Sequence, residues 1–330
     1  MASAAARAGV QTAVLDGIDA LLADARGALD CHPVPYMRTE WLRLQATLVP
    51  QCARVTTVVA RGGADAVWLP LDVEGQGWAS WYALRAGPIH IGAPRADLLA
   101  PAIRALGRRH ARIFLAPLDP ADAALTREAF RLAGWWSRES EATANWVAHV
   151  AGKSFADYWA SRPAQLRNTV RRKTKSAALD VAIHDAFDAE AWAAYESVYA
   201  ASWKGAEGSP AFLRAMAEWA GREGRLRLGI AHKNGRPVAA QLWTIDGDTA
   251  TIHKLAYDEA FKPLSPGSIL GHAMFAHVID RDRPALIDYG TGDDGYKAAW
   301  MDERRSLRRI EAWNLRTVAG LAMRLHSKLS

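Results

Sequence analysis

The feature that most constrains the fold is a pattern that recurs in the two halves of the 330-residue chain. Residues 54–72 and 225–246 share paired apolar runs around a glycine turn, and 98–119 and 269–290 share a helix-like run followed by a strand-like run. In both halves the first strand-like run begins 43 residues before the helix-like run. Self-similarity of this length indicates two copies of one unit that contains helices and strands.

The stretch between the copies predicts how the chain divides. "NWVAHV" (145–150) is strand-like and is expected to close the first unit, and the helices after Ser154 are expected to open the second. We therefore expect a boundary near Ala151, with domains 1–150 and 151–330. No long Gly/Ser/Pro linker lies there, so the units are expected to pack against each other.

Composition narrows the class of protein. Half of the residues are hydrophobic and the formal net charge is +6, which favours anionic partners without the basicity of a dedicated nucleic-acid binder. The two cysteines have no zinc or redox spacing, which fits a reducing cytoplasm. The N-terminal 22 residues are interrupted by Asp16 and Asp19 and resemble a signal peptide poorly, and no apolar run is long enough to span a bilayer. We expect a cytoplasmic protein.

Residues 226–257 contain three strand-like runs joined by Asn234-Gly235 and Gly247-Asp248, which predicts an antiparallel meander. A helix is expected from about Gly267 to Asp280, followed by a strand in "ALIDYG", a short helix in "DDGYKAAWM" and a last strand in "SLRRIEAWNL". The expected fold class is α/β (α+β), with two tandem units that each have a mixed, mostly antiparallel sheet flanked by helices.

The junction "LSPGSIL" between the meander and the helix has the features of an anion site. Ser265 suits the N-cap, Pro266 suits the first helical position, and Gly267 presents bare backbone. The N–H groups of Gly267, Ser268 and Ile269 are then expected to be unpaired at the positive end of the helix dipole, where a phosphate binds well. An ordinary helix start is the alternative interpretation.

This order of elements resembles the GNAT acyltransferase superfamily, in particular its cellulose-biosynthesis-type acetyltransferase branch, which is related to the Fem peptidyltransferases. The resemblance lies in "YDEAFKPLSPGSILGHAMF", "LIDYGTGDDGYKAAWM" and "LRNTVRRKTKSA"; it covers residues 150–315 and reaches the first half only through the repeat. It implies acyl-CoA as co-substrate, with aminoacyl-tRNA, the donor of Fem relatives, as the alternative. The loop departs from the usual glycine-rich one, with Lys262 and the single Gly267 in that region.

By this resemblance, the loop and first helical turn would hold the pyrophosphate of coenzyme A. The residues implied are Leu264, Ser265, Pro266, Gly267, Ser268, Ile269 and Leu270. The backbone of the preceding strand, at Leu255, Ala256 and Tyr257, would polarise the thioester carbonyl through an N–H donor.

Candidate catalytic residues lie in "IDYGTGDDGYKAAW". Asp288 leaves a strand edge and is the predicted general base for an ammonium nucleophile. The resemblance implies that Tyr296 protonates the departing thiolate, and Lys297 would hold Asp288 or bind donor phosphate. Asp293 is a predicted substrate contact. A solvated acidic turn with an ion pair is the alternative for this loop.

His253 is a further candidate base because its ordinary pKa suits the role, although a strand histidine is as often structural. Strand alternation predicts that His253 shares a face with Leu255 and Tyr257, opposite Lys254.

Two basic segments are candidate substrate contacts. Arg167, Arg171 and Lys175 would form one helical stripe, which either faces solvent or binds an anion such as a CoA 3'-phosphate, a lipid headgroup of an anionic membrane surface, or tRNA. By analogy with the family, Trp203 and Lys204 would reach the cleft. The sequence shows no metal-ligand spacing, so no metal is expected.

These features predict an N-acyltransferase that moves an acyl group from acyl-CoA to a primary amine by direct attack in a ternary complex. The acceptor could be an amino sugar, an amino acid or a long-chain amino alcohol such as a sphingoid base. The alternatives are a Fem-like, tRNA-dependent peptidyltransferase and a non-catalytic module that supports exopolysaccharide synthesis. The first unit lacks a Ser-Pro-Gly helix start and a Tyr-Lys pair, so it is expected to be a degenerate copy.

Overall fold

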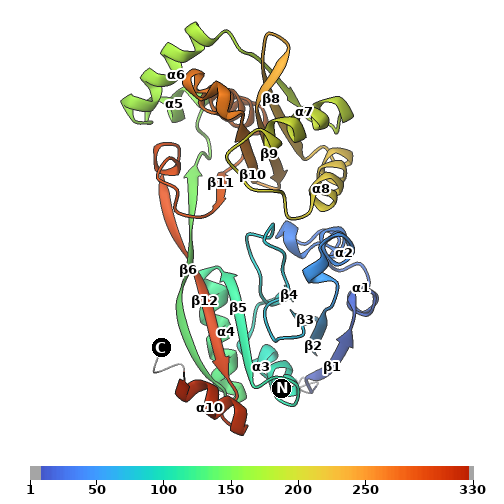
Figure 1. Ribbon diagram of the computed structural model, residues 1–330. Helices are drawn as coiled ribbons and strands as arrows, with labels where there is room; N and C mark the ends of the chain where they lie inside the picture. The colour runs from blue at the N-terminus through green and yellow to red at the C-terminus, as the bar shows by residue number, and fades with distance from the viewer. Residues whose placement is uncertain (1–8, 327–330) are drawn as a thin grey trace, which may run out of the picture. The chain divides into compact units, whose positions relative to one another are not determined.

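The computed structural model describes residues 9–326 and divides the chain into two compact units (Figure 1). The first unit contains the residues up to Thr143 and those from Ser306 onward, and the second is Ala144–Arg305. Two strands, β6 (Trp136–His149) and β12 (Glu303–Trp313), contribute residues to both. Residues 1–8 of the N-terminal stretch considered above lie outside the described residues.

The first unit contains a four-stranded antiparallel sheet and a three-stranded group. The sheet has the order β1 (Gln11–Asp16), β2 (Thr56–Gly62), β3 (Asp65–Leu71) and β4 (Ile89–Ile91). The group has the order β5 (Arg112–Leu118), β12, β6. The helices are α1 (Ile18–Ala25), α2 (Thr39–Leu48), α3 (Ala96–Leu106), α4 (Pro120–Ala133) and α10 (Val318–His326).

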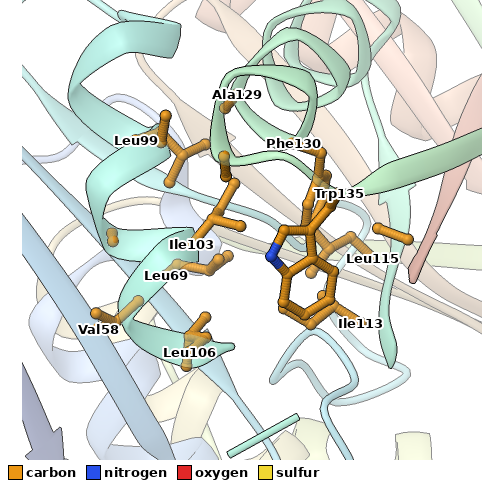
Figure 2. Packing of buried hydrophobic residues seen from close by; sticks show 14 of the residues in the cluster. Val58, Leu69, Leu99, Ile103, Leu106, Ile113, Leu115, Ala129, Phe130 and Trp135 are labelled. Carbon is orange, nitrogen blue, oxygen red and sulfur yellow. The ribbon is translucent and has the colours of Figure 1, made fainter. Parts of the chain in front are cut away.

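The predicted pairs of elements in the first half are confirmed. The hairpin of β2 and β3 occupies 54–72, and α3 followed by β5 occupies 98–119. Leu69 of β3, Ile103 of α3, Leu115 of β5 and Phe130 of α4 meet in one buried cluster (Figure 2). Burial of such side chains contributes about 1.5–3 kcal/mol each, so this cluster holds the two helices on the strands.

The second unit is a six-stranded sheet in the order β6-β11-β10-β9-β8-β7. Only β10 and β11 pair in parallel; the other neighbours are antiparallel. The strands are β7 (Asp180–His184), β8 (Leu226–Lys233), β9 (Arg236–Asp246), β10 (Thr249–Tyr257) and β11 (Leu286–Thr291). The helices are α5 (Phe155–Ala160), α6 (Ala164–Ala177), α7 (Ala189–Ala200), α8 (Pro210–Arg222) and α9 (Pro266–His277).

The predicted meander, helix and strand of the second half are therefore confirmed as β8, β9, β10, α9 and β11. Three short helical turns complete the connections, at Glu259–Leu264, Val278–Asp282 and Lys297–Ala299. Both units have sheets flanked by helices, as expected; the parallel strand pair that makes a sheet mixed, β10 with β11, lies in the second unit.

Two strands lie in other units than the sequence suggested. Asn145–His149 of "NWVAHV" pairs with β11, so this run belongs to the second unit and does not close the first. The last strand, β12, forms as predicted, but from Ser306 onward it belongs to the first unit because Ile310 and Ala312 are buried in that unit's core. The structural division thus differs from a single cut at Ala151.

Helices cover both faces of the central strands in the second unit. α9 packs on the sheet face that carries the side chains of Gln241 and Trp243 of β9. Gln241 Nε2 donates to Gly267 O at 3.3 Å, and the Trp243 ring lies edge-on to Phe275. Leu242 points to the opposite face by strand alternation and is fully buried there. The contacts of α7 with β8, β9 and β10 cover that face, and α8 contacts β8 (Figure 1).

Within residues 9–326, no helix is both long and apolar enough to cross a membrane.

Candidate functional site

A cavity of about 620 Å³ lies in the second unit where β10 and β11 part. The parallel pairing of these strands covers only Thr249–Thr251 with Leu286–Asp288. Leu255 and Tyr257 of β10 and Tyr289 of β11, which follow the paired residues, line the cavity together with the start of α9. We call this space the β10–β11 cavity.

A β-bulge at His253 determines which side chains of β10 reach the cavity. The pairing of β10 with β9 shifts between Ile252 and Lys254, so the alternation changes phase there. Ile252, Leu255 and Tyr257 consequently contact the same apolar cluster, and the prediction that His253 shares a face with Leu255 and Tyr257 is wrong.

His253 does not line the β10–β11 cavity. Its Nε2 is 2.9 Å from Thr244 Oγ1, and burial lowers its pKa to about 4. The imidazole is therefore neutral at neutral pH and is held at the bulge.

The start of α9 differs in detail from the predicted anion site. Pro266 is the first helical residue, as predicted, but Ser265 has left-handed backbone angles (φ 55°, ψ 48°) and its side chain makes no capping bond. The N–H groups of Ser268 and Ile269 both donate to Ser265 O, at 3.1 and 3.2 Å, so the prediction that they are unpaired is wrong. Among the described residues, none accepts a hydrogen bond from Gly267 N–H.

Three other helices of the second unit begin with ordinary side-chain caps. Ser154, Asp188 and Ser209 accept hydrogen bonds from backbone N–H groups at the starts of α5, α7 and α8. At α9 the chain instead brings a glycine against an aromatic ring, since a Cβ on Gly267 would lie 3.2 Å from Tyr257 Cδ1. Bare backbone at this position keeps the cavity open beside Tyr257.

The structure places six of the ten predicted donor-binding residues in the cavity wall. These are Leu255, Tyr257, Ser265, Pro266, Gly267 and Ser268. Ala256, Ile269 and Leu270 are at most 6% exposed, and Leu264 is not among the lining residues.

The loop after β11 presents a carboxylate and a phenol to the cavity. Asp294 and Tyr296 both line it, and their side chains are well exposed. Partial burial of the Tyr296 side chain and the nearby Asp294 carboxylate raise the pKa of Tyr296 to about 12. The Tyr296 hydroxyl therefore keeps its proton at neutral pH and can donate it.

Asp288 and Lys297 lie behind this loop and outside the cavity wall. Asp288 is 7% exposed, and its Oδ1 accepts from Asn145 Nδ2 at 2.6 Å and from Gly290 N at 2.8 Å. Lys297 Nζ donates to Thr291 O at 2.6 Å, and burial lowers its pKa. Both side chains hold the backbone that positions Asp294 and Tyr296.

The remaining predicted contacts are dispersed. Arg304 of β12 donates hydrogen bonds to both carboxylate oxygens of Asp293, and Trp146 Nε1 of β6 donates to Asp293 Oδ1 at 3.1 Å. The Asp293 carboxylate is therefore bound by side chains of these two strands. The hydrogen bond from Arg304 lowers the pKa of Asp293. Trp203 lines the cavity, with its ring centroid 4.6 Å from that of Tyr257. Lys204 lines a different cavity.

The predicted basic stripe on α6 lines neither of these two cavities. Arg167 Nε donates to Arg162 O at 3.0 Å, and Arg171 donates to Asn168 Oδ1 at 2.9 Å.

Sequence reasoning missed Gln241, which lies 4% exposed in the floor of the cavity. Its Oε1 accepts from Trp243 Nε1 at 3.0 Å, and its Nε2 bonds the backbone of Gly267. The signal was a lone amide in the apolar run "VAAQLW", because a buried polar side chain in a strand needs partners.

In the described part of the chain, no group of three or more His, Cys, Asp or Glu residues is placed to hold a metal ion.

Comparison with known proteins adds a family match and a set of similar folds. The family model described as an acetyltransferase (GNAT) domain matches residues 160–298, most of the second unit. No curated protein matches the chain by sequence.

Solved structures resemble the chain over most of its length. FemX has a TM-score of 0.59 at 8% identity, covering 87% of this chain and 95% of FemX. A tandem GNAT protein from the clavulanic acid biosynthesis pathway has a TM-score of 0.50 at 15% identity, covering 91% and 98%. The C-terminal domain of a putative lysylphosphatidylglycerol synthetase from Agrobacterium fabrum has a TM-score of 0.54 at 12% identity, covering 78% and 83%. At these identities the likeness shows the fold, that of tandem GNAT and Fem-type proteins.

Proposed function

We propose that the chain is an N-acyltransferase that moves an acyl group from acyl-CoA to a primary amine in the β10–β11 cavity, because residues 160–298 match the family model described as an acetyltransferase (GNAT) domain. The observation that carries the proposal is the cavity itself. It opens where two parallel strands part, and the bare start of α9 and a protonated phenol, Tyr296, lie in its wall.

The start of α9 suits a phosphate-bearing donor in three respects. The Gly267 N–H is available, a side chain at this position would fill space beside Tyr257, and the helix dipole favours an anion. Lys262, whose side chain is largely exposed, lies in the same wall, with its Nζ 3.8 Å from Glu259 Oε2. The donor would supply an activated thioester carbonyl; the protein would bind and orient it.

The cavity wall can serve the proton transfers that the reaction needs. The acceptor ammonium must lose a proton before its nitrogen attacks, and the sulfur must gain one as the C–N bond forms and the C–S bond breaks. The second proton of the nitrogen then returns to the group that protonated the sulfur. We assign the first role to Asp294, whose exposed carboxylate lines the cavity with Lys297 Nζ 3.5 Å from its Oδ2, in place of Asp288, whose buried carboxylate is engaged by Asn145 and Gly290. Tyr296 donates the proton to the sulfur.

Aminoacyl-tRNA is the second candidate donor. The exposed basic residues Arg171, Arg172 and Lys175 on α6 favour it, since they would suit a phosphate backbone. This candidate keeps the same amine chemistry and changes only the donor.

The test is donor binding by the purified protein. We expect acetyl-CoA or a longer acyl-CoA to raise the melting temperature, and Gly267→Ala to weaken binding roughly tenfold, about 1.4 kcal/mol, because the methyl group enters the cavity at Tyr257. Gly295→Ala is the matched control, since no heavy atom lies within 4 Å of the added Cβ.

If aminoacyl-tRNA raises the melting temperature and acyl-CoA does not, the donor is aminoacyl-tRNA. The absence of both effects, with no ligand retained on the purified protein by mass spectrometry, would favour the non-catalytic module.

A further inference from the structure

A second cavity, of about 300 Å³, lies in the same unit between α7, the 204–210 loop and α8. We call it the aromatic cavity, because Trp192, Tyr195 and Tyr199 of α7 form one wall and Leu213 of α8 lies in another. Its size and lining are those of small-molecule sites, which are mostly apolar with a few polar groups.

Lys204 is a cation in the wall of this cavity. Its Nζ lies 5.9 Å from the centroid of the Tyr199 ring and 5.7 Å from that of Trp203. Within residues 9–326, no carboxylate lies in ion-pair distance of Lys204 Nζ. By contrast, the neighbouring Lys254 is 2.8 Å from Glu207 Oε2, with both side chains less than 10% exposed.

The surroundings of Lys204 favour an anionic ligand. Burial, followed by the repulsion of Lys254, lowers the pKa of Lys204 to about 8. The Glu207 and Asp294 carboxylates offset part of this lowering, but neither is ion-paired with Lys204. An anion beside the partly desolvated ammonium would therefore stabilise its charge. The chain supplies the rings and the ammonium, and a carboxylate would complete the site.

The aromatic cavity and the β10–β11 cavity are lined by adjacent residues of the chain, Lys204 and Trp203. Trp203 lines the β10–β11 cavity with its ring tilted by 41° to that of Tyr257, while Lys204 lines the aromatic cavity. Asp294, in the wall of the β10–β11 cavity, is close enough to Lys204 for its charge to raise the lysine pKa. Lys204, which can pair with a ligand carboxylate, and Asp294, which can pair with a ligand ammonium, therefore lie near each other. The apolar space of the aromatic cavity lies beside Lys204.

We propose that the acceptor is an α-amino acid with an apolar or aromatic side chain. Its side chain occupies the aromatic cavity, its carboxylate pairs with Lys204, and its ammonium faces Asp294. The assignment rests on the proposed acyl transfer and names the substrate class for that site.

In the reaction, the acceptor ammonium gives a proton to Asp294 and the amine nitrogen forms a bond to the acyl carbon. The bond from that carbon to sulfur breaks, and the sulfur takes a proton from Tyr296. As the amide forms, the nitrogen loses its second proton to the Tyr296 phenolate. The products are an N-acyl amino acid and a free thiol, and Asp294 releases its proton to solvent.

Three amines separate the elements of the proposal: L-phenylalanine, phenethylamine, which lacks the carboxylate, and L-serine, which lacks the apolar side chain. Calorimetric titration should show binding of L-phenylalanine at least tenfold tighter than of either other amine. The same order is expected for kcat/KM with the acyl-CoA that stabilises the protein. Equal binding of phenylalanine and phenethylamine, or of phenylalanine and serine, would overturn the proposal, as would preference for a long-chain amino alcohol.

Substitutions in the cavity wall test whether phenylalanine binds in the aromatic cavity. Ala200→Trp fills the aromatic cavity and should abolish phenylalanine binding, whereas Ala193→Trp, at an exposed alanine on the same helix but outside the cavity wall, should not. Ala206→Trp gives a second filling variant from the loop. Lys204→Met should remove the difference between phenylalanine and phenethylamine, and Lys153→Met, at an exposed lysine, should retain it.

Binding measured without donor keeps this inference separate from the proposed function. Acyl-CoA binding without preference for apolar amino acids overturns the acceptor class alone. If the protein binds phenylalanine, Ala200→Trp abolishes that binding, and no acyl-CoA binds, then the assignment of acyl-CoA as donor is wrong and the amino-acid site stands.

Discussion

At the scale of single residues, three aspartates near the end of β11 have different surroundings. Asp293 is held by Arg304 and Trp146, Asp288 by Asn145 and Gly290, and only Asp294 lines the β10–β11 cavity. The side chain that faces the cavity is therefore set by the path of the turn.

The first prediction separates Asp294 from Asp288. Asp294→Asn should lower kcat by roughly a hundredfold or more with little change in the urea midpoint. Asp288→Asn should lower the free energy of unfolding by about 1–3 kcal/mol, since it disturbs buried hydrogen bonds to Asn145 and Gly290. An inactive but fully stable Asp288→Asn protein, alongside a fully active Asp294→Asn protein, would restore Asp288 as the base.

The second prediction concerns the proton donor. Tyr296→Phe should lower kcat roughly a hundredfold and leave acyl-CoA binding unchanged, because the ring stays in the wall while the hydroxyl is lost. With the pKa of Tyr296 at about 12, its ionisation should not limit activity below about pH 11. Unchanged turnover in single-turnover kinetics would show that solvent supplies the proton.

At the scale of elements, the bulge at His253 is what changes the side-chain pattern of β10 ahead of the cavity. Burial lowers the pKa of His253 to about 4, against an ordinary value of about 6.5. Between these values the unfolded chain binds a proton that the folded chain does not, so the free energy of unfolding falls as pH is lowered from about 6.5 to 4.

The third prediction follows from that linkage. His253→Gln keeps a polar partner for Thr244 but does not titrate, so urea midpoints should fall less between pH 7 and pH 5 than in the wild type. Part of the dependence should persist, since burial also lowers the pKa of His90 to about 4. An identical pH dependence in the two proteins would show that His253 titrates normally.

The elements of the second unit could be predicted because local chemistry specifies them. Asn234-Gly235 fixes a hairpin and Pro266 fixes a helix start in any context. The bulge could not be predicted, because "TATIHKLAY" alternates regularly and the phase change depends on pairing with β9. The backbone of Ser265 and the choice between Asp293 and Asp294 likewise depend on distant partners.

At the scale of the whole molecule, the first unit is discontinuous and the second is continuous. β12 supplies Ile310 and Ala312 to the core of the first unit after the chain has passed through the second. Ser306 Oγ donates to Glu141 Oε2 at 2.9 Å, so the two segments of the first unit lie side by side where they leave it. A sequence pattern alone could not show this return, since it records strand type and not strand partner.

The fourth prediction uses this division. Residues 144–305 expressed alone should unfold cooperatively in urea and bind acyl-CoA, whereas residues 1–150 alone should not unfold cooperatively, because β12 is missing from their core. A chain that joins 1–143 to 306–330 by a short Gly-Ser linker should regain cooperative unfolding. Cooperative unfolding of 1–150 alone would show that β12 is dispensable.

The discontinuity also has a consequence during translation. The 162 residues of Ala144–Arg305 must leave the ribosome before β12 does, which takes roughly 10–30 s at about 5–20 residues per second. Throughout that interval β5 lacks the neighbour that it has in the finished sheet, and an unpaired strand edge is a site for wrong pairing. The nascent N-terminal unit is thus the part of the protein that most needs a chaperone, although the proposed chemistry belongs to the unit that folds before it.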